Sequence, residues 1–268
     1  MAKVRYERVG AASVLTISRP ERRNAVDDET AALLLDGFRA FEQDGEARVM
    51  VLTGAGSEAF CAGADLKALA ERAGELAVEE PESVVQNWLD QHPDGPLGFT
   101  RLEASKPTIG AISGWCLAGG LELALWCDLR IATPTARLGF TERRFGVPLI
   151  DGGTQRLPRV VGRGRALEMI LTGRLVDAEE ALRWGLVNEV VDEGAHIDRA
   201  LEIAEGIAAF PQETMLSDRR AALEGAGLPM REGLALEAEL GAASALSGVR
   251  GAARFAAGEG RGAEGAGV

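Results

Sequence analysis

Two short turns in this sequence have the residue types and spacing that could stabilise a developing negative charge. The first, Phe60 to Lys67, and the second, Trp115 to Ala124, are rich in small residues, and each follows an apolar segment typical of a buried strand. Small residues let a ligand approach backbone N–H groups, and a helix that begins there adds unpaired donors and partial positive charge. Two such turns side by side would form an oxyanion hole, worth about 2.7–4 kcal/mol per donor. Taken alone, each turn is more typical of an ordinary strand-to-helix connection.

Two glutamates follow the second turn. Glu122 lies in the first turn of the predicted second helix with apolar residues on both sides, which favours burial. Burial would raise the pKa of its carboxyl group toward the range that acid–base catalysis uses. Glu142 precedes Arg143 and Arg144, and taken alone it is a typical surface ion-pair partner.

The elements that must position these groups alternate between strands and helices, which predicts an α/β fold for the first two thirds of the chain. An amphipathic helix is predicted over 30–44, with Asp27 or Asp28 as its N-cap. The predicted strands are 14–18, 49–53, 108–113, 129–133 and 187–191. After residue 194 the pattern becomes helical, over 195–210, 212–224, 231–247 and 248–257.

Composition limits the class of protein. The chain has 268 residues, of which 46% are hydrophobic and 26% charged, as expected for a globular protein. Its net charge of −12 argues against nucleic-acid binding. Three cysteines in apolar surroundings and the absence of a signal-peptide pattern indicate a reduced, cytoplasmic protein. The most apolar stretch, 107–126, contains Glu122 and several glycines, so no membrane span is expected.

The motifs taken together resemble the enoyl-CoA hydratase/isomerase (crotonase) family, over residues 10 to 257. Each motif is moderately specific alone, and their joint order and spacing make a chance match improbable. The matching strings are Asn24-Ala25, Cys61–Lys67, Ala118–Ala124, Cys127-Asp128, Gly152–Pro158, Val161-Gly162, Leu171–Gly173, Ala181 and Gly185–Val187.

This resemblance implies a crotonase-like spiral of ββα units over 1–194. It also implies a C-terminal helical region over 195–257 that packs in trimers, so the partners would be identical subunits in a homotrimer or dimer of trimers. The Gly- and Ala-rich tail, 258–268, is expected to be disordered. The substrate would be an acyl-CoA of fatty acid metabolism, with no metal and no separate cofactor, because coenzyme A is part of the substrate.

The resemblance also implies the reaction and its residues. The oxyanion donors would be the backbone N–H groups of Ala64 and Gly119. Glu122 and Glu142 match the two hydratase glutamates and would hold one water between them, so that a 2-enoyl-CoA becomes a 3-hydroxyacyl-CoA. Acid and base are not assigned separately, because coupled carboxylates titrate as a pair. The implied coenzyme A contacts are Arg22, Ala25, Ala62, Asp65, Leu66, Lys67 and Phe255, with Arg261 in place of an expected lysine.

The sequence departs from the family pattern in two further places. Asp151 stands where a small or aromatic residue is usual, and it is interpreted as the N-cap of a helix near Gly153 in preference to a third functional carboxylate. An insertion over 73–98 is expected to roof the acyl pocket, with Asn87, Trp88, Leu89 and His92 as its shaping residues. An ion pair with Arg143 or Arg144 would turn Glu142 away from the substrate.

Other functions remain open. The alternatives to hydration are an enoyl-CoA isomerase, which needs fewer carboxylates, and an acyl-CoA-binding homologue without turnover. A serine hydrolase is disfavoured, because no Gly-x-Ser-x-Gly elbow is present and neither histidine is a convincing catalytic partner. Cys61 is interpreted as a small turn residue because no general base lies near it, and His196 as structural or exposed.

Overall fold

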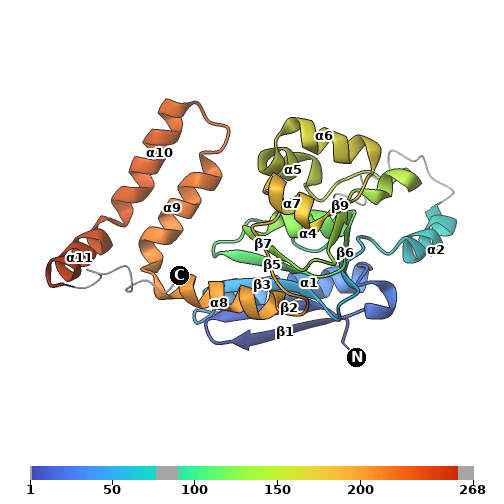
Figure 1. Ribbon diagram of the computed structural model, residues 1–268, viewed down its shortest axis with the longest axis horizontal. Coiled ribbons are helices and arrows are strands. Elements are labelled where there is room, and N and C mark those ends of the chain that lie inside the picture. The colour runs from blue at the N-terminus through green and yellow to red at the C-terminus, as the bar shows by residue number, and fades with distance from the viewer. Residues whose placement is uncertain (1, 77–89, 91, 259–268) are drawn as a thin grey trace. The chain divides into compact units, whose positions relative to one another are not determined.

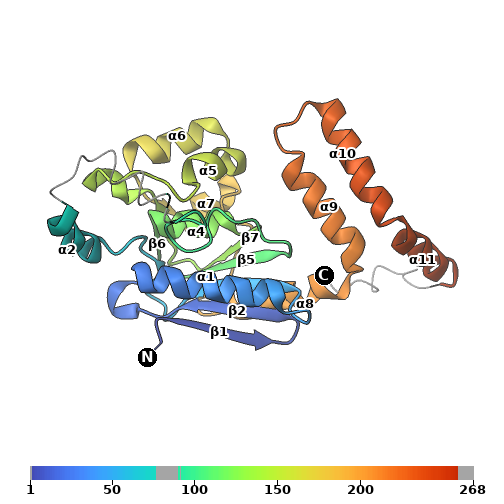
Figure 2. The same cartoon turned by 180° about the vertical axis from the view of Figure 1, so that it is seen from behind.

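The computed structural model describes residues 2–76, 90 and 92–258. Contacts within the chain divide it into two compact units, Met1–Glu202 and Ile203–Val268. The division predicted after residue 194 stays a prediction, and nearly all of the predicted disordered tail lies outside the described residues. Each unit is described by itself below, and Figures 1 and 2 show the elements of both.

The larger sheet of the first unit is mostly parallel and buried. Its strand order is β1 (Val4–Val9), β2 (Ala12–Ile17), β3 (Val49–Gly54), β5 (Thr108–Ile112), β7 (Leu129–Ala132) and β10 (Glu189–Val190). Strands β1 and β2 pair antiparallel, and the pairs from β2 onward are parallel. Every residue of β2, β3 and β5 is buried. The continuous apolar sequences of β3 and β5 therefore correctly predicted buried parallel strands, which are covered on both faces.

A smaller sheet contains the strands that follow β3, β5 and β7 along the chain. Its order is β4 (Ala59–Cys61), β6 (Trp115–Leu117), β8 (Arg137–Gly139) and β9 (Val176–Asp177). Thus β3 leads to β4 and then to helix α2 (Leu66–Leu76), and β5 leads to β6 and then to α4 (Gly119–Trp126). Strands β7 and β8 lead through the 3-10 helix η2 (Thr141–Phe145) to α5 (Gly153–Val161). This repetition confirms the predicted spiral of ββα units.

Helix α1 (Asp28–Gln43) covers β1 and β2, as Figure 2 shows. The Asp27 side chain accepts a hydrogen bond from the Thr30 N–H at 2.9 Å, which confirms Asp27 as the N-cap. Leu34, Phe38 and Phe41 are buried, as the amphipathic pattern predicted. Figure 1 shows α6 (Arg163–Thr172) and α7 (Ala178–Trp184) grouped with α5 near α4.

The C-terminal elements are helical, as predicted. Helix α8 (His196–Ala209) crosses the division between the units and is followed by α9 (Gln212–Glu224), α10 (Met230–Ala243) and α11 (Ala245–Ala256). Helices α9, α10 and α11 bury none of their residues. Within the described part of the chain, no helix has the length and apolar character needed to cross a membrane.

Helix α4 is held in place at its C-terminal end by Arg130, a buried residue of β7. The Arg130 Nη1 donates to the Cys127 carbonyl at 2.6 Å and to the Ala124 carbonyl at 3.4 Å. Its Nε donates to the Leu186 carbonyl at 2.7 Å. The side chain thereby satisfies the Cys127 carbonyl at the end of the helix and adds a second donor to the Ala124 carbonyl, which already accepts from the Cys127 N–H. It also ties α4 to the loop before β10.

We expect Arg130→Met to lower the free energy of unfolding by about 2–4 kcal/mol, because the substitution removes the side-chain donor to the Cys127 and Leu186 carbonyls. Urea unfolding followed by far-ultraviolet circular dichroism measures the change. The matched control is Arg159→Met on the exposed side of α5, which should change the free energy of unfolding by less than about 0.5 kcal/mol. Equal effects of the two substitutions would contradict this role of Arg130.

Candidate active site

The two glycine-containing turns lie against each other, because β4 and β6 are parallel neighbours in the smaller sheet. A methyl group built on Gly63 would lie 2.9 Å from the Gly119 backbone nitrogen. One built on Gly120 would lie 2.1 Å from the Cys61 carbonyl oxygen. The turns therefore approach at a separation that only glycine permits at these positions.

The two predicted oxyanion donors flank this contact. The Val26 N–H donates to the Gly63 carbonyl and the Asp65 N–H donates to the Val26 carbonyl, both at 2.8 Å. These two hydrogen bonds form a short parallel bridge on either side of Ala64, and the Ala64 N–H takes no part in it. Gly119 is the first residue of α4, where backbone N–H groups lack intrahelical partners. Neither the Ala64 nor the Gly119 N–H donates to another described residue.

Ala118, directly before Gly119, has an unusual backbone conformation. Its φ is 51° and its ψ is −126°, in a region that residues with a Cβ rarely occupy. Its N–H donates to the Gly139 carbonyl at 2.8 Å, and its carbonyl accepts from Leu121 at 2.9 Å. The hydrogen bond to the Ala118 carbonyl fixes the peptide plane that carries the Gly119 N–H, and the hydrogen bond from the Ala118 N–H fixes the plane before it. Strain of this kind is typical of functional sites.

Glu122 is 3% exposed and lies one helical turn after Gly119. Its Oε1 accepts hydrogen bonds from the Gly153 N–H at 2.7 Å and the Asp151 N–H at 3.0 Å. Burial, and then the charges of Asp151 and Glu142, raise the pKa of Glu122 to about 8 against the opposing effect of the two N–H groups. The predicted burial and its effect on the pKa both occur.

Glu142 is also buried, at the start of η2. Both of its carboxylate oxygens lack a hydrogen-bond partner among the described residues. Arg143 donates instead to the Ile170 carbonyl at 3.3 Å, so the ion pair that would turn Glu142 away is not formed. Burial raises the pKa of Glu142, and its charge acts on Glu122. An unpaired buried carboxylate of this kind is costly unless a ligand uses it.

Asp151 is a third buried carboxylate, and the interpretation of its side chain as a helix cap is wrong. The N-cap of α5 is Gly152, with φ 102° and no side-chain hydrogen bond. The Asp151 Oδ1 instead accepts from the Leu97 N–H at 3.1 Å and from the Thr100 hydroxyl. The carboxylate of Glu122 receives the Gly153 N–H, so a side chain from α4 takes the role expected of Asp151.

A family model for enoyl-CoA hydratase/isomerase matches residues 7–240. The chain is 38% identical over 220 residues to (E)-benzylidenesuccinyl-CoA hydratase of Thauera aromatica, covering 82% of each chain. It is 37% identical over 237 residues to short-chain-enoyl-CoA hydratase of Clostridium acetobutylicum, covering 87% of this chain and 85% of that relative.

The chain belongs to the enoyl-CoA hydratase/isomerase family. The crystal structure of an enoyl-CoA hydratase from Bacillus anthracis superposes with a TM-score of 0.77 and 34% identity, covering 89% of each chain. The crotonase fold of this family is therefore present, as the motifs predicted. Because the family contains both hydratases and isomerases, membership leaves the reaction to be argued from the side chains.

The coenzyme A contacts expected from the family lie on several elements. Arg22 is exposed in the 3-10 helix η1 (Pro20–Arg22), and Lys67 is exposed on α2. Ala25 is buried, and the Ala62 N–H donates to the Arg23 carbonyl at 3.0 Å. Leu66 is exposed at the start of α2, and Phe255 is exposed on α11 in the second unit. Their roles in binding stay predictions, and Arg261 lies outside the described residues.

Asp65 has a structural partner that the sequence did not indicate. Its carboxylate accepts from Arg19 Nη2 at 2.9 Å, and the same nitrogen lies 3.0 Å from the N-cap Asp27. The Arg19 hydrogen bond lowers the pKa of Asp65, although burial opposes it. Arg19 thus joins the N-terminus of α1 to the turn that carries Ala64. Its signal in the sequence was an arginine before Pro20 at the end of a strand, which is not specific.

Three further expectations concern residues around the site. Burial raises the pKa of the Cys61 thiol to about 12, in line with a small turn residue rather than a nucleophile. His196 is buried, and neither ring nitrogen has a partner among the described residues. His92 is partly buried, whereas Asn87, Trp88 and Leu89 lie outside the described residues, so the proposed roof of the acyl pocket stays a prediction.

The raised pKa of Glu122 predicts a specific dependence of stability on pH. Between its ordinary value of 4.5 and about 8, the folded protein keeps a proton that the unfolded chain has lost. Stability therefore falls as pH rises through this window, by at most about 1.4 kcal/mol per pH unit from this group. Glu122→Gln removes this contribution, so the free energy of unfolding should fall less steeply from pH 5 to 8.

Chemical unfolding at several pH values measures the two slopes. Glu213→Gln, an exposed change on α9, is the matched control and should keep the wild-type slope. Identical slopes in wild type and Glu122→Gln would show that Glu122 does not hold a proton in the folded protein at neutral pH.

Proposed function

We propose that this protein adds water across the double bond of a 2-enoyl-CoA to give a 3-hydroxyacyl-CoA. The observation that carries the proposal is the pair of buried carboxylates, Glu122 and Glu142. Burial raises the pKa of both, and the charge of Glu142 further raises the pKa of Glu122, which indicates one shared site. Addition of water to an enoyl thioester needs one group to accept a proton and another to donate one. A coupled carboxylate pair that holds one proton supplies both.

The oxyanion hole supplies the electrostatic part of the mechanism. The thioester oxygen would accept from the N–H groups of Ala64 and Gly119, which donate to no other described residue. Attack of water on C3 moves the electrons of the double bond toward this oxygen and forms an enolate. Donors already fixed at the site where charge develops stabilise that enolate without reorganisation.

The two glutamates are sufficient for all the proton transfers of the reaction. The water oxygen forms a bond to C3, and its proton passes to the ionised carboxylate. The protonated carboxyl group delivers its proton to C2 as the enolate collapses back to the thioester. The pair begins and ends each turnover with one proton. Glu142 suits contact with the water because neither of its carboxylate oxygens has a partner among the described residues.

The relatives support the same reaction class. Both curated proteins named above are called hydratases of CoA thioesters, and so is the crystallised homologue. Their acyl groups differ, since one name specifies benzylidenesuccinyl-CoA and another a short-chain enoyl-CoA. The names therefore favour hydration and leave the acyl group open.

We expect hydration of crotonyl-CoA, measured as loss of the conjugated enoyl absorbance. Glu122→Gln and Glu142→Gln should each lower kcat by about 10²–10⁴-fold, because each removes one of the two proton-transferring groups. Melting temperatures close to that of wild type serve as the control that the variants are folded.

Three outcomes would contradict the proposal. Unchanged activity of Glu142→Gln would exclude the two-carboxylate mechanism. Conversion of a 3-enoyl-CoA to a 2-enoyl-CoA without hydration would assign an isomerase. Tight acyl-CoA binding without turnover across chain lengths would assign a binding protein.

We also propose that the protein acts as a homotrimer or a dimer of trimers, in line with the family pattern. Helices α9, α10 and α11 expose large apolar side chains, which commonly mark an association surface. They are Leu223, Met230, Leu234, Leu246, Val249 and Phe255.

Light scattering after size-exclusion chromatography should give a mass three or six times that of one chain. Leu234→Arg combined with Val249→Arg should yield smaller species, because charges would replace exposed apolar contacts. Arg159→Glu on α5 is a control that should leave the mass unchanged. A monomeric wild-type protein at micromolar concentration would rule out this assembly.

A further inference from the structure

Asp151 is buried yet has no part in the proton transfers of the proposed reaction. Its backbone N–H donates to Glu122, but its carboxylate contacts a different segment. There, Oδ1 accepts from the Leu97 N–H and the Thr100 hydroxyl. The residue therefore joins the loop that supports Glu122 to a chain segment more than fifty positions earlier.

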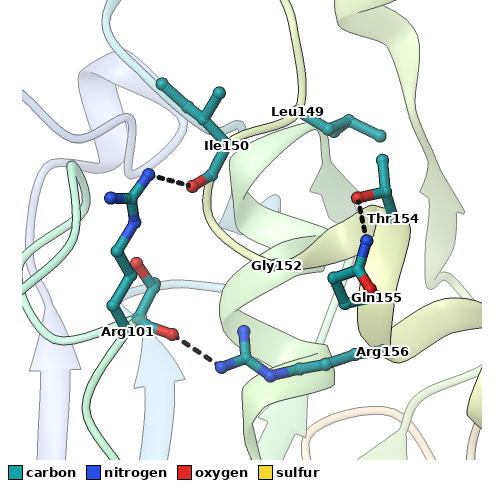
Figure 3. Close-up of a pocket in the computed structure, with 8 residues that line it drawn as sticks. Arg101, Leu149, Ile150, Gly152, Thr154, Gln155 and Arg156 are labelled. Carbon is teal, nitrogen blue, oxygen red and sulfur yellow. Dashed lines mark hydrogen bonds between the residues drawn. The ribbon is translucent and has the colours of Figure 1, made fainter. Parts of the chain in front are cut away.

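These contacts form a closed ring of hydrogen bonds around Asp151. Arg156 Nη1 donates to the Asp151 carbonyl at 2.8 Å, and Arg156 Nη2 donates to the Thr100 carbonyl at 2.6 Å. The Thr100 hydroxyl closes the ring on the Asp151 carboxylate. Arg101 donates to the Ile150 carbonyl at 3.2 Å. Figure 3 shows this hydrogen bond together with Arg156. These arginines line a cavity of about 360 Å³ on this side of the loop.

The segment that Asp151 holds is itself compact and anchored. Phe99 is fully buried, with ring centroids 5.3 Å from Phe38 and 4.5 Å from Trp126, the last residue of α4. The Trp126 indole N–H donates to the Leu102 carbonyl at 2.8 Å. The segment is thereby fixed to the far end of the helix whose first residue is Gly119.

Leu97 places this segment next to the oxyanion hole. A methyl group built on Gly119 would lie 2.5 Å from Leu97 Cδ1, so the leucine side chain occupies the space above the Gly119 Cα. If the thioester oxygen accepts a hydrogen bond from the Gly119 N–H, the acyl α-carbon lies close to the Leu97 side chain, because only two covalent bonds separate it from that oxygen. Leu97 is 3% exposed, and the hydrogen bond from its main-chain N–H to Asp151 keeps the residue from moving away from Gly119.

We propose that Asp151 is a positioning residue that holds Leu97 as a wall beside the acyl α-carbon, so that the site selects acyl-CoA thioesters unbranched at that carbon. This inference rests on the proposed function in placing a thioester at Ala64 and Gly119. One extra methyl group that a pocket must accept or reject changes affinity by about tenfold or more.

The test compares dissociation constants for butyryl-CoA and isobutyryl-CoA, which differ by branching at the α-carbon. Isothermal titration calorimetry gives both without turnover. Wild type should bind butyryl-CoA at least about tenfold more tightly than isobutyryl-CoA. Thr100→Val, an isosteric change that removes the hydroxyl donor, should reduce this ratio, and Leu97→Ala should reduce it further.

Two conservative variants separate the hydrogen-bond ring from general packing. Thr100→Ser keeps the hydroxyl, so its ratio of dissociation constants for the two ligands should equal that of wild type. Asp151→Asn keeps an acceptor oxygen for Leu97 and Thr100, so it should also keep the selectivity. Melting temperatures confirm that each variant is folded.

The outcomes distinguish the two proposals. Equal weakening of both ligands by Thr100→Val, or failure of Thr100→Ser to restore the ratio, would overturn the role of Asp151 while leaving hydration intact. Loss of selectivity in Asp151→Asn would overturn the hydrogen-bond ring in favour of a charge effect. Binding of both ligands with the expected ratio but without hydration of crotonyl-CoA would overturn the proposed reaction and retain the wall.

Discussion

One buried carboxylate accepts hydrogen bonds from two backbone N–H groups, and the rest of the site depends on this interaction. Glu122 Oε1 receives the N–H groups of Asp151 and Gly153, which links α4 to the start of α5. The helix end gains an acceptor that its own N-cap, Gly152, lacks. The carboxyl group in turn gains donors that offset part of its desolvation. Because both partners are main-chain atoms, the position of Glu122 depends on the path of the loop and little on side-chain identity there.

Three buried carboxylates lie near one another in a chain whose net charge is already negative. Burial raises the pKa values of Glu122, Glu142 and Asp151. The guanidinium of Arg156 lies nearby, but both hydrogen bonds it makes go to main-chain carbonyls. Burial brings the pKa of Glu122 to about 8, so this carboxyl group lowers its electrostatic cost by keeping a proton rather than by pairing with a cation. A group that keeps a proton near neutral pH is suited to giving that proton to a substrate.

Much of this arrangement could be predicted from the sequence because it depends on local pattern. Continuous apolar segments indicated the parallel strands, Asp27 indicated the start of α1, and small residues indicated the turns around Gly63 and Gly119. The partners of Asp151 could not be predicted, because Leu97 and Thr100 reach it only through the tertiary fold. A helix-cap pattern was present in the sequence there, but a long-range acceptor from α4 replaced it. The ion pair of Arg19 could not be predicted for the same reason, since Asp65 lies far along the chain.

The backbone of Ala118 sets stability and reactivity against each other. A non-glycine residue at φ 51° costs on the order of 1–3 kcal/mol, and glycine would relieve most of it. Yet the methyl group of alanine narrows the conformations open to the peptide that presents the Gly119 N–H. Relief of the strain would leave the Gly119 N–H less well fixed, so under the proposed mechanism the more stable protein would be the slower catalyst. Attempts to engineer heat resistance into this chain should therefore leave position 118 untouched and seek their gains elsewhere.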